Sequence, residues 1–150
     1  MSDKTDLIKL YSGQILALAA DIPFTERLAT PQASAKRRSP LCGSTVTVDL
    51  TLTDGKVIEY GQDVKACALG QAAASVTGSA IIGRTEDEVR TAQTQLKAML
   101  KSDGPAPDAP FDGLKVLLPA KDFKNRHASI LLALDATLDA FEQASRADCA

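Results

Sequence analysis

The stretch from Thr45 to Thr53 places strong limits on the fold, because polar and apolar residues alternate through it without a break. This period of two is typical of a β-strand with one buried face. Asp54-Gly55 follows directly, and this dipeptide favours a two-residue type I′ turn. The sequence therefore predicts an antiparallel hairpin in which Lys56 to Ala66 returns as the second strand.

The register of this hairpin requires one irregularity. A strict two-residue turn pairs Leu52 with Val57, and the apolar residues of the returning strand then fall one residue out of step with those of the first. A β-bulge adds one residue to one strand and reverses the facing of the side chains beyond it. We therefore predict a bulge near Gly61 that places Val64 on the same face as Val46.

Apolar residues at steps of three and four predict helices on both sides of the hairpin. The first spans Asp6 to Ala20, and a second, rich in alanine and glycine, spans Cys67 to Ile82. A third runs from a capping box that begins at Thr85 to about Lys101. The last begins near His127 and carries the apolar residues that should close the core.

Two segments lack either periodicity. We expect the stretch from Thr25 to Pro40 to be an extended, solvated connection, and the Pro-rich residues 102–110 to form a second loop. A chain of 150 residues fits one domain, so we expect residues 1–150 to form a single unit. The order of elements predicts an α+β fold, with a small antiparallel sheet of about three strands and helices packed on one face.

The composition excludes several classes of function. There are 17 Lys and Arg residues against 19 Asp and Glu, so the net charge of −2 gives no general attraction to nucleic acids. No apolar run reaches the roughly 18 to 20 residues of a membrane helix, and the first residues do not follow the pattern of a signal peptide. We therefore expect a cytoplasmic protein that binds neither nucleic acid nor membrane.

The cysteines point to thiol or metal chemistry. Cys42, Cys67 and Cys149 are an odd number, which argues against a disulfide framework and for reduced thiols. Cys42 precedes the first strand, in a loop, and Cys67 lies where the second strand passes into a helix. The positive end of a helix dipole favours a thiolate at such a position.

Packing offers a simpler interpretation of each candidate. An isolated cysteine in a small domain is more often a buried filler than a ligand. His127, the only histidine, follows a basic segment near a helix start, where a capping or surface role is common. A Cys-His hydrolase would also need a third orienting residue, and no residue stands out for that role.

Six short segments carry a resemblance to a known family. The sequence resembles the U-type iron-sulfur cluster assembly scaffolds, which include IscU, SufU and the N-terminal part of NifU, and the Pro-rich segment looks most like the SufU branch. The resemblance implies a SufE/NifU-like fold. The segments that carry it are Tyr11 to Ile15 of the first predicted helix, Pro40-Leu41-Cys42-Gly43-Ser44, Asp54-Gly55-Lys56-Val57-Ile58, Lys65-Ala66-Cys67-Ala68, Gly83-Arg84-Thr85 and His127-Ala128-Ser129.

The resemblance also implies a ligand set. Members of the family hold clusters, and commonly zinc, on three cysteines with an Asp two residues after the first, often with a His directly before the third. Cys42 and Cys67 match the first two cysteines, and His127 matches either that His or a substitution at the third cysteine, since Ala128 follows it. Ser44 stands where the family has Asp. The implied site is Cys42, Cys67 and His127, with Ser44, a water or a partner's cysteine as a fourth ligand.

The implied function is a non-enzymatic scaffold or sulfur acceptor that carries a transient iron-sulfur cluster or zinc. Cys42 would accept persulfide sulfur from a cysteine desulfurase, and cluster-accepting apoproteins would be the recipients. We expect a monomer or a weak homo-oligomer. Two alternatives remain open: a zinc-binding paralogue that acts as an interaction module, and a Cys-His thiol transferase in which His127 keeps Cys42 or Cys67 as a thiolate.

Overall fold

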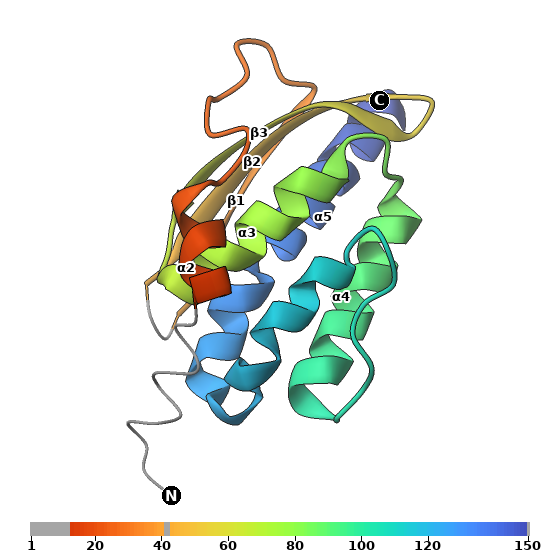
Figure 1. The fold of residues 1–150 in the computed structure, drawn as a ribbon. Coiled ribbons are helices and arrows are strands. Elements are labelled where there is room, and N and C mark those ends of the chain that lie inside the picture. Colours follow the sequence, from red (N-terminus) through yellow and green to blue (C-terminus); the bar gives the residue numbers. More distant parts are fainter. Residues whose placement is uncertain (1–12, 41–42, 150) are drawn as a thin grey trace, which may run out of the picture.

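A computed structural model describes residues 13–40 and 43–149 as one arrangement of helices around a small sheet (Figure 1). The elements in chain order are α2 (Gly13–Ala20), β1 (Ala33–Arg38), β2 (Thr45–Thr53), β3 (Lys56–Lys65), α3 (Ala68–Ile81), α4 (Glu86–Lys101), the 3-10 helices η1 (Asp112–Asp122) and η2 (Lys124–Arg126), and α5 (His127–Cys149).

The sheet has three antiparallel strands in the order β1-β2-β3. The predicted hairpin is confirmed, and both turn residues have positive φ, 53° at Asp54 and 77° at Gly55, as a type I′ turn requires. The helices gather on one side of the sheet (Figure 1). These observations confirm the α+β fold class.

The helices form two layers. Helix α5 packs against β1 and β2, and α3 packs against β3, α2 and α5, whereas α4 and η1 pack on the side of this layer away from the sheet. The largest fully buried side chains lie between these layers and are Ile15, Leu50, Leu69, Ile81, Leu96, Met99, Leu100, Leu114, Leu117, Ile130 and Leu134. The predicted final helix therefore closes the core.

The bulge exists, but its predicted position was wrong. Thr51 pairs with Glu59 and Leu52 pairs with Val57, so Ile58 is the extra residue on β3. Val64 lies opposite Val46, as expected. The bulge sits close to the turn because the strict two-residue turn fixes the Leu52 pair, and the register must shift immediately beyond it.

The prediction of a loop throughout Thr25 to Pro40 was also wrong, because residues 33–38 form strand β1. Its core-facing residues Ala33 and Ala35 are 5% and 6% exposed, and alanine gives a weak apolar signal in a sequence. Arg37 also faces the helices, where its Nε donates to Asp139 Oδ2 of α5 at 2.5 Å. The polar residues of this edge strand therefore obscured the alternation that would have predicted β1.

The other face of the sheet is partly covered by the segment of residues 21–32. Asp49, on this outer face, accepts hydrogen bonds from the Arg27 side chain and from the Leu28 backbone N–H. Gly61 pairs with Asp49 in the register, and a Cβ at this position would lie 2.6 Å from the Glu26 carbonyl oxygen. The absence of a side chain at position 61 therefore allows the segment to lie close against β3.

The remaining helix predictions agree with the structure where it describes them. Helix α2 covers Gly13–Ala20, and the predicted part before it, residues 6–12, lies outside the described residues. Thr85 and Glu88 form the predicted capping box of α4, and Lys101 is its last residue. No helix in the described ranges is long and apolar enough to cross a lipid bilayer.

Candidate functional site

Cys67 lies at the junction of β3 and α3. Strand β3 ends at Lys65, and Cys67 is the N-cap residue of α3, with extended backbone angles and no capping hydrogen bond from its side chain. The thiol is partly exposed and forms no disulfide. Cys67 therefore lies at the N-terminus of α3, where the helix dipole is positive, as the sequence predicted.

Among the described residues, two linked serines lie near this sulfur. The Cys67 Sγ lies 3.5 Å from Ser129 Oγ, and the Ser129 hydroxyl donates to Ser44 Oγ at 3.1 Å. Both serines are buried, at 1% and 5% exposure. Three elements that are distant in sequence thus meet at one point: the start of β2, the start of α3 and the first turn of α5.

Gly70 makes this meeting possible. A Cβ at position 70 would lie 2.7 Å from Ser129 Oγ, 2.8 Å from Ala66 Cβ and 3.2 Å from the Ser129 carbonyl oxygen. Contacts below 3.0 Å are too short for a real side chain, so α3 and α5 can only approach this closely at a glycine. The small residues of α3 were predicted to allow tight packing, and Gly70 shows where that packing serves the site.

Cys42 lies outside the described residues, so the structure does not place its sulfur. The described residues on either side of positions 41 and 42 are hydrogen-bonded to one another. Ser39 N–H donates to the Ser44 carbonyl at 2.8 Å, and Gly43 N–H donates to the Ser39 carbonyl at 3.0 Å. These two bonds close the connection between β1 and β2 at its base and fix Ser44 next to Ser129.

His127 begins α5 and is 3% exposed. Its Nε2 lies 3.1 Å from the Ala120 carbonyl oxygen and 3.0 Å from that of Lys121. Carbonyl oxygens only accept hydrogen bonds, so Nε2 carries a proton and donates it. In this arrangement only Nδ1 can offer a lone pair to a metal.

The side chain of His127 faces a different part of the molecule from Ser129. Together with Ala128, Leu131 and Asp135, it lines a pocket of about 720 Å³ between α5, the end of α4 and the end of η1. Successive residues of a helix are about 100° apart, which puts Ser129 on another face of α5. The Cys67 sulfur therefore contacts the Ser129 hydroxyl, whereas His127 Nε2 contacts two backbone carbonyls.

Within residues 13–40 and 43–149, no group of three or more His, Cys, Asp or Glu side chains is arranged to hold a metal ion. Among the described residues, the Ser129 hydroxyl lies beside the Cys67 sulfur and the Ser44 hydroxyl lies beyond it, and hydroxyls bind metals poorly unless they lose a proton. A cluster or zinc would therefore need further sulfur or nitrogen donors, and Cys42 is the first of these in the sequence prediction. The set of Cys42, Cys67 and His127 remains a prediction.

Sequence reasoning did not single out Ser129 or Gly70 as site residues. Ser129 entered only as part of the segment that follows His127. A signal was present, because Ser129, Ala133, Ala136 and Ala140 recur at helical spacing and are all buried, which marks a face of α5 suited to close packing. What that face would approach could not be deduced from the spacing.

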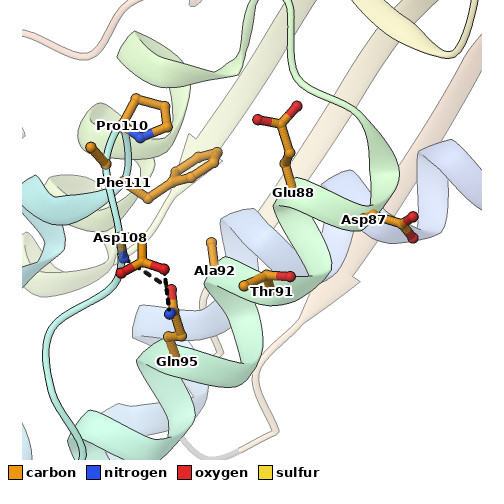
Figure 2. Close-up of a pocket in the computed structure, with 9 residues that line it drawn as sticks. Asp87, Glu88, Thr91, Ala92, Gln95, Asp108, Pro110 and Phe111 are labelled. Carbon is orange, nitrogen blue, oxygen red and sulfur yellow. Dashed lines mark hydrogen bonds between the residues drawn. The ribbon is translucent and has the colours of Figure 1, made fainter.

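A second hollow, of about 260 Å³, lies between α4 and the residues before η1 (Figure 2). Two of its three carboxylates are engaged in structural bonds: Glu88 accepts from Thr85 and Arg84, and Asp108 accepts from Gln95 Nε2 at 3.0 Å. Gln95 in turn accepts from the Asp108 N–H at 2.9 Å. These bonds fasten the Pro-rich loop to α4, so we do not assign a site to this hollow.

Comparison with known proteins places this geometry in context. No protein-family model matches the chain, and a search of curated proteins finds no significant match. Among solved structures, the N-terminal part of a nitrogen-fixing NifU-like protein from Brucella abortus is 44% identical with a TM-score of 0.91, and the match covers 94% of this chain and 98% of that one.

A second solved structure has the same fold at lower identity. It is a proposed iron-sulfur cluster assembly scaffold protein for the SUF system from thermophilic Fervidobacterium islandicum AW-1, with a TM-score of 0.79 and 20% identity over 88% of this chain and 96% of that one. The fold is thus the small α+β fold of the NifU-like N-terminal domain, which the SUF-system protein shares. On the identity to the Brucella abortus protein, the chain belongs to the family of NifU-like N-terminal domains.

Proposed function

We propose that this protein is an iron-sulfur cluster assembly scaffold that receives persulfide sulfur from a cysteine desulfurase. Membership of the NifU-like family supports the scaffold role. The observation that carries it is the position of Cys67, partly exposed at the start of α3 beside the buried pair Ser44 and Ser129. A reduced thiol at a helix N-terminus is suited to sulfur chemistry.

In this proposal Cys42 is the persulfide acceptor. The Cys42 thiolate attacks the outer sulfur of the donor persulfide, a new S–S bond forms, and the donor cysteine leaves as a thiolate with the electron pair of the broken S–S bond. The step needs no external oxidant. Cys67 would then help to hold the iron that arrives as substrate. His127 would help through Nδ1, because its Nε2 is engaged, and this would require its ring to turn towards Cys67 from the pocket that it lines.

The protein would act as a carrier and not as an enzyme. It would work in the cytoplasm, as a monomer or weak homo-oligomer, and would hand its cluster to apoproteins. Zinc would be an alternative occupant of the same residues, since zinc accepts mixed Cys and His ligands.

Anaerobic reconstitution tests the proposal. The metal-free protein is incubated with ferrous iron, cysteine and a cysteine desulfurase, and cluster formation is followed by visible absorption. We expect cluster bands in the wild type and in Cys149→Ala, and their loss in Cys42→Ala and Cys67→Ala. A wild-type protein that forms no bands while it binds one equivalent of zinc by elemental analysis would contradict the scaffold role and support the zinc-binding paralogue.

A further inference from the structure

The sulfur of Cys67 lies at the end of a short chain of side-chain hydrogen bonds. Cys67 Sγ is 3.5 Å from Ser129 Oγ, which is 3.1 Å from Ser44 Oγ. A serine hydroxyl has one proton to donate and two lone pairs to accept with. With the Ser129 proton directed to Ser44, as the geometry gives it, Ser129 can accept from a Cys67 thiol proton.

The direction of this chain can reverse. When Cys67 carries an added sulfur, Sγ has no proton to donate, and Ser129 can turn its own proton towards the sulfur atoms. Ser44 can then donate to Ser129 in place of accepting from it. Both buried hydroxyls remain paired in either state, which matters because leaving a buried hydroxyl unpaired is unfavourable.

Close packing holds Ser129 in the position needed for this exchange. Its Oγ is 2.7 Å from the place a Cβ of residue 70 would occupy, so any residue larger than glycine would displace it. Ser129 lies in the first turn of α5 and is 1% exposed, so water does not compete effectively for its hydroxyl. Within the part of the chain that the structure describes, the hydroxyl is therefore directed to two neighbours, the sulfur of Cys67 and the oxygen of Ser44.

We propose that Ser129 is a positioning residue for sulfur carried on Cys67, which stabilises a persulfide there by turning its hydroxyl from Ser44 to the sulfur. This proposal rests on the proposed function, because it assigns Cys67 a part in the handling of the same sulfur. The Cys67 thiolate attacks the outer sulfur of a persulfide R–S–SH, forming Cys67–S–SH. The donor S–S bond breaks, and R–S⁻ leaves with its electron pair.

The lifetime of the persulfide on Cys67 tests this role without iron or a desulfurase. In a Cys42→Ala, Cys149→Ala background Cys67 is the only cysteine, because the chain has three. The metal-free protein is loaded with glutathione persulfide, the reagent is removed, and the loss of one added sulfur atom is followed by intact-protein mass spectrometry. Ser129→Ala removes the hydroxyl that donates a hydrogen bond to the charged persulfide on Cys67. The half-life of the persulfide should therefore fall about tenfold.

Three further variants make the result specific. Ser129→Thr restores the hydroxyl and should restore the half-life, and Ser145→Ala, an exposed serine on the same helix, should leave it unchanged. Ser44→Ala should shorten it only about twofold to threefold, because Ser129 can still donate to the sulfur. Circular dichroism shows whether each variant folds, and Ser44→Ala tests the hydrogen-bond chain from its other end if Ser129→Ala does not fold. An unchanged persulfide half-life in a folded variant of either serine would overturn the proposal.

The outcomes for the two proposals are separable. If the persulfide decays at the same rate with and without the Ser129 hydroxyl, Ser129 has no such role, yet cluster reconstitution can still succeed. If reconstitution fails while Ser129→Ala shortens the persulfide lifetime, the scaffold role is wrong and sulfur carriage on Cys67 stands.

Discussion

The Asp49 carboxylate is fully buried and accepts hydrogen bonds from both Nε and Nη2 of Arg27, at 2.6 and 3.0 Å. Ser34 Oγ donates to the same carboxylate at 2.7 Å, and the Leu28 N–H donates at 3.1 Å. Burial raises the pKa of Asp49, but these donors together outweigh it and hold the pKa below its usual range. The carboxylate fastens the 21–32 segment to the outer face of the sheet.

Asp49→Asn should therefore destabilise the protein by about 2 kcal/mol, because the amide accepts through one oxygen only and loses the charge that strengthens each bond. Urea denaturation monitored by circular dichroism measures the change. Asp63→Asn is the matched control on the same face of the sheet, since its side chain is 44% exposed and its nearest cation is 3.9 Å away. Equal losses of stability in the two variants would contradict this stabilising role of Asp49.

The same carboxylate predicts a dependence of stability on pH. Because the folded-state pKa of Asp49 is lowered, its contribution is present above the unfolded-state pKa of about 3.9 and is lost as the pH falls through the folded value. The difference in stability between the wild type and Asp49→Asn should be constant from pH 7 to about pH 5 and should narrow below about pH 4. A difference that stays constant down to pH 3 would contradict this account.

Gly70→Ala should destabilise the protein by about 1 to 3 kcal/mol, because the new methyl group overlaps Ala66 Cβ and Ser129 where α3 meets α5. Alanine is favoured over glycine inside helices by roughly 1 kcal/mol, so a loss would show that the overlap outweighs propensity. Gly13→Ala is the control, since no atom of the described residues lies within 4 Å of its added Cβ. Thermal unfolding of both variants decides between propensity and packing, and an increase in both midpoints would refute the close approach.

His127→Ala should lower stability by about 1 to 3 kcal/mol even without metal, because the Ala120 and Lys121 carbonyls lose their shared donor. The measurement is urea denaturation of the metal-free protein. Cys67→Ala, which removes a partly exposed thiol, is the comparison and should cost less. If His127→Ala and the wild type unfold at the same urea concentration, the hydrogen bonds of the His127 ring do not stabilise the fold, and the ring would be free for a role as a ligand alone.

Local chemistry explains why much of the fold could be predicted. The alternation of Thr45 to Thr53, the Asp54-Gly55 turn and the capping box at Thr85 depend on neighbouring residues, and each has the predicted form. Strand β1 was missed because Ala33 and Ala35 become core residues only when α5 covers them. The bulge was placed at Gly61 because a glycine suggests irregular backbone, whereas this glycine makes room for the Glu26 carbonyl.

The sequence by itself determined which residues could carry sulfur chemistry, since cysteine in a motif before a helix has that potential in any arrangement of the helices. Only the tertiary structure decided what surrounds Cys67. Ser44, Cys67 and Ser129 are separated by at least 23 positions along the chain and come together because α3 and α5 cross at Gly70. Packing between distant segments has no local signature, so the hydroxyls beside the sulfur emerged only from the folded chain.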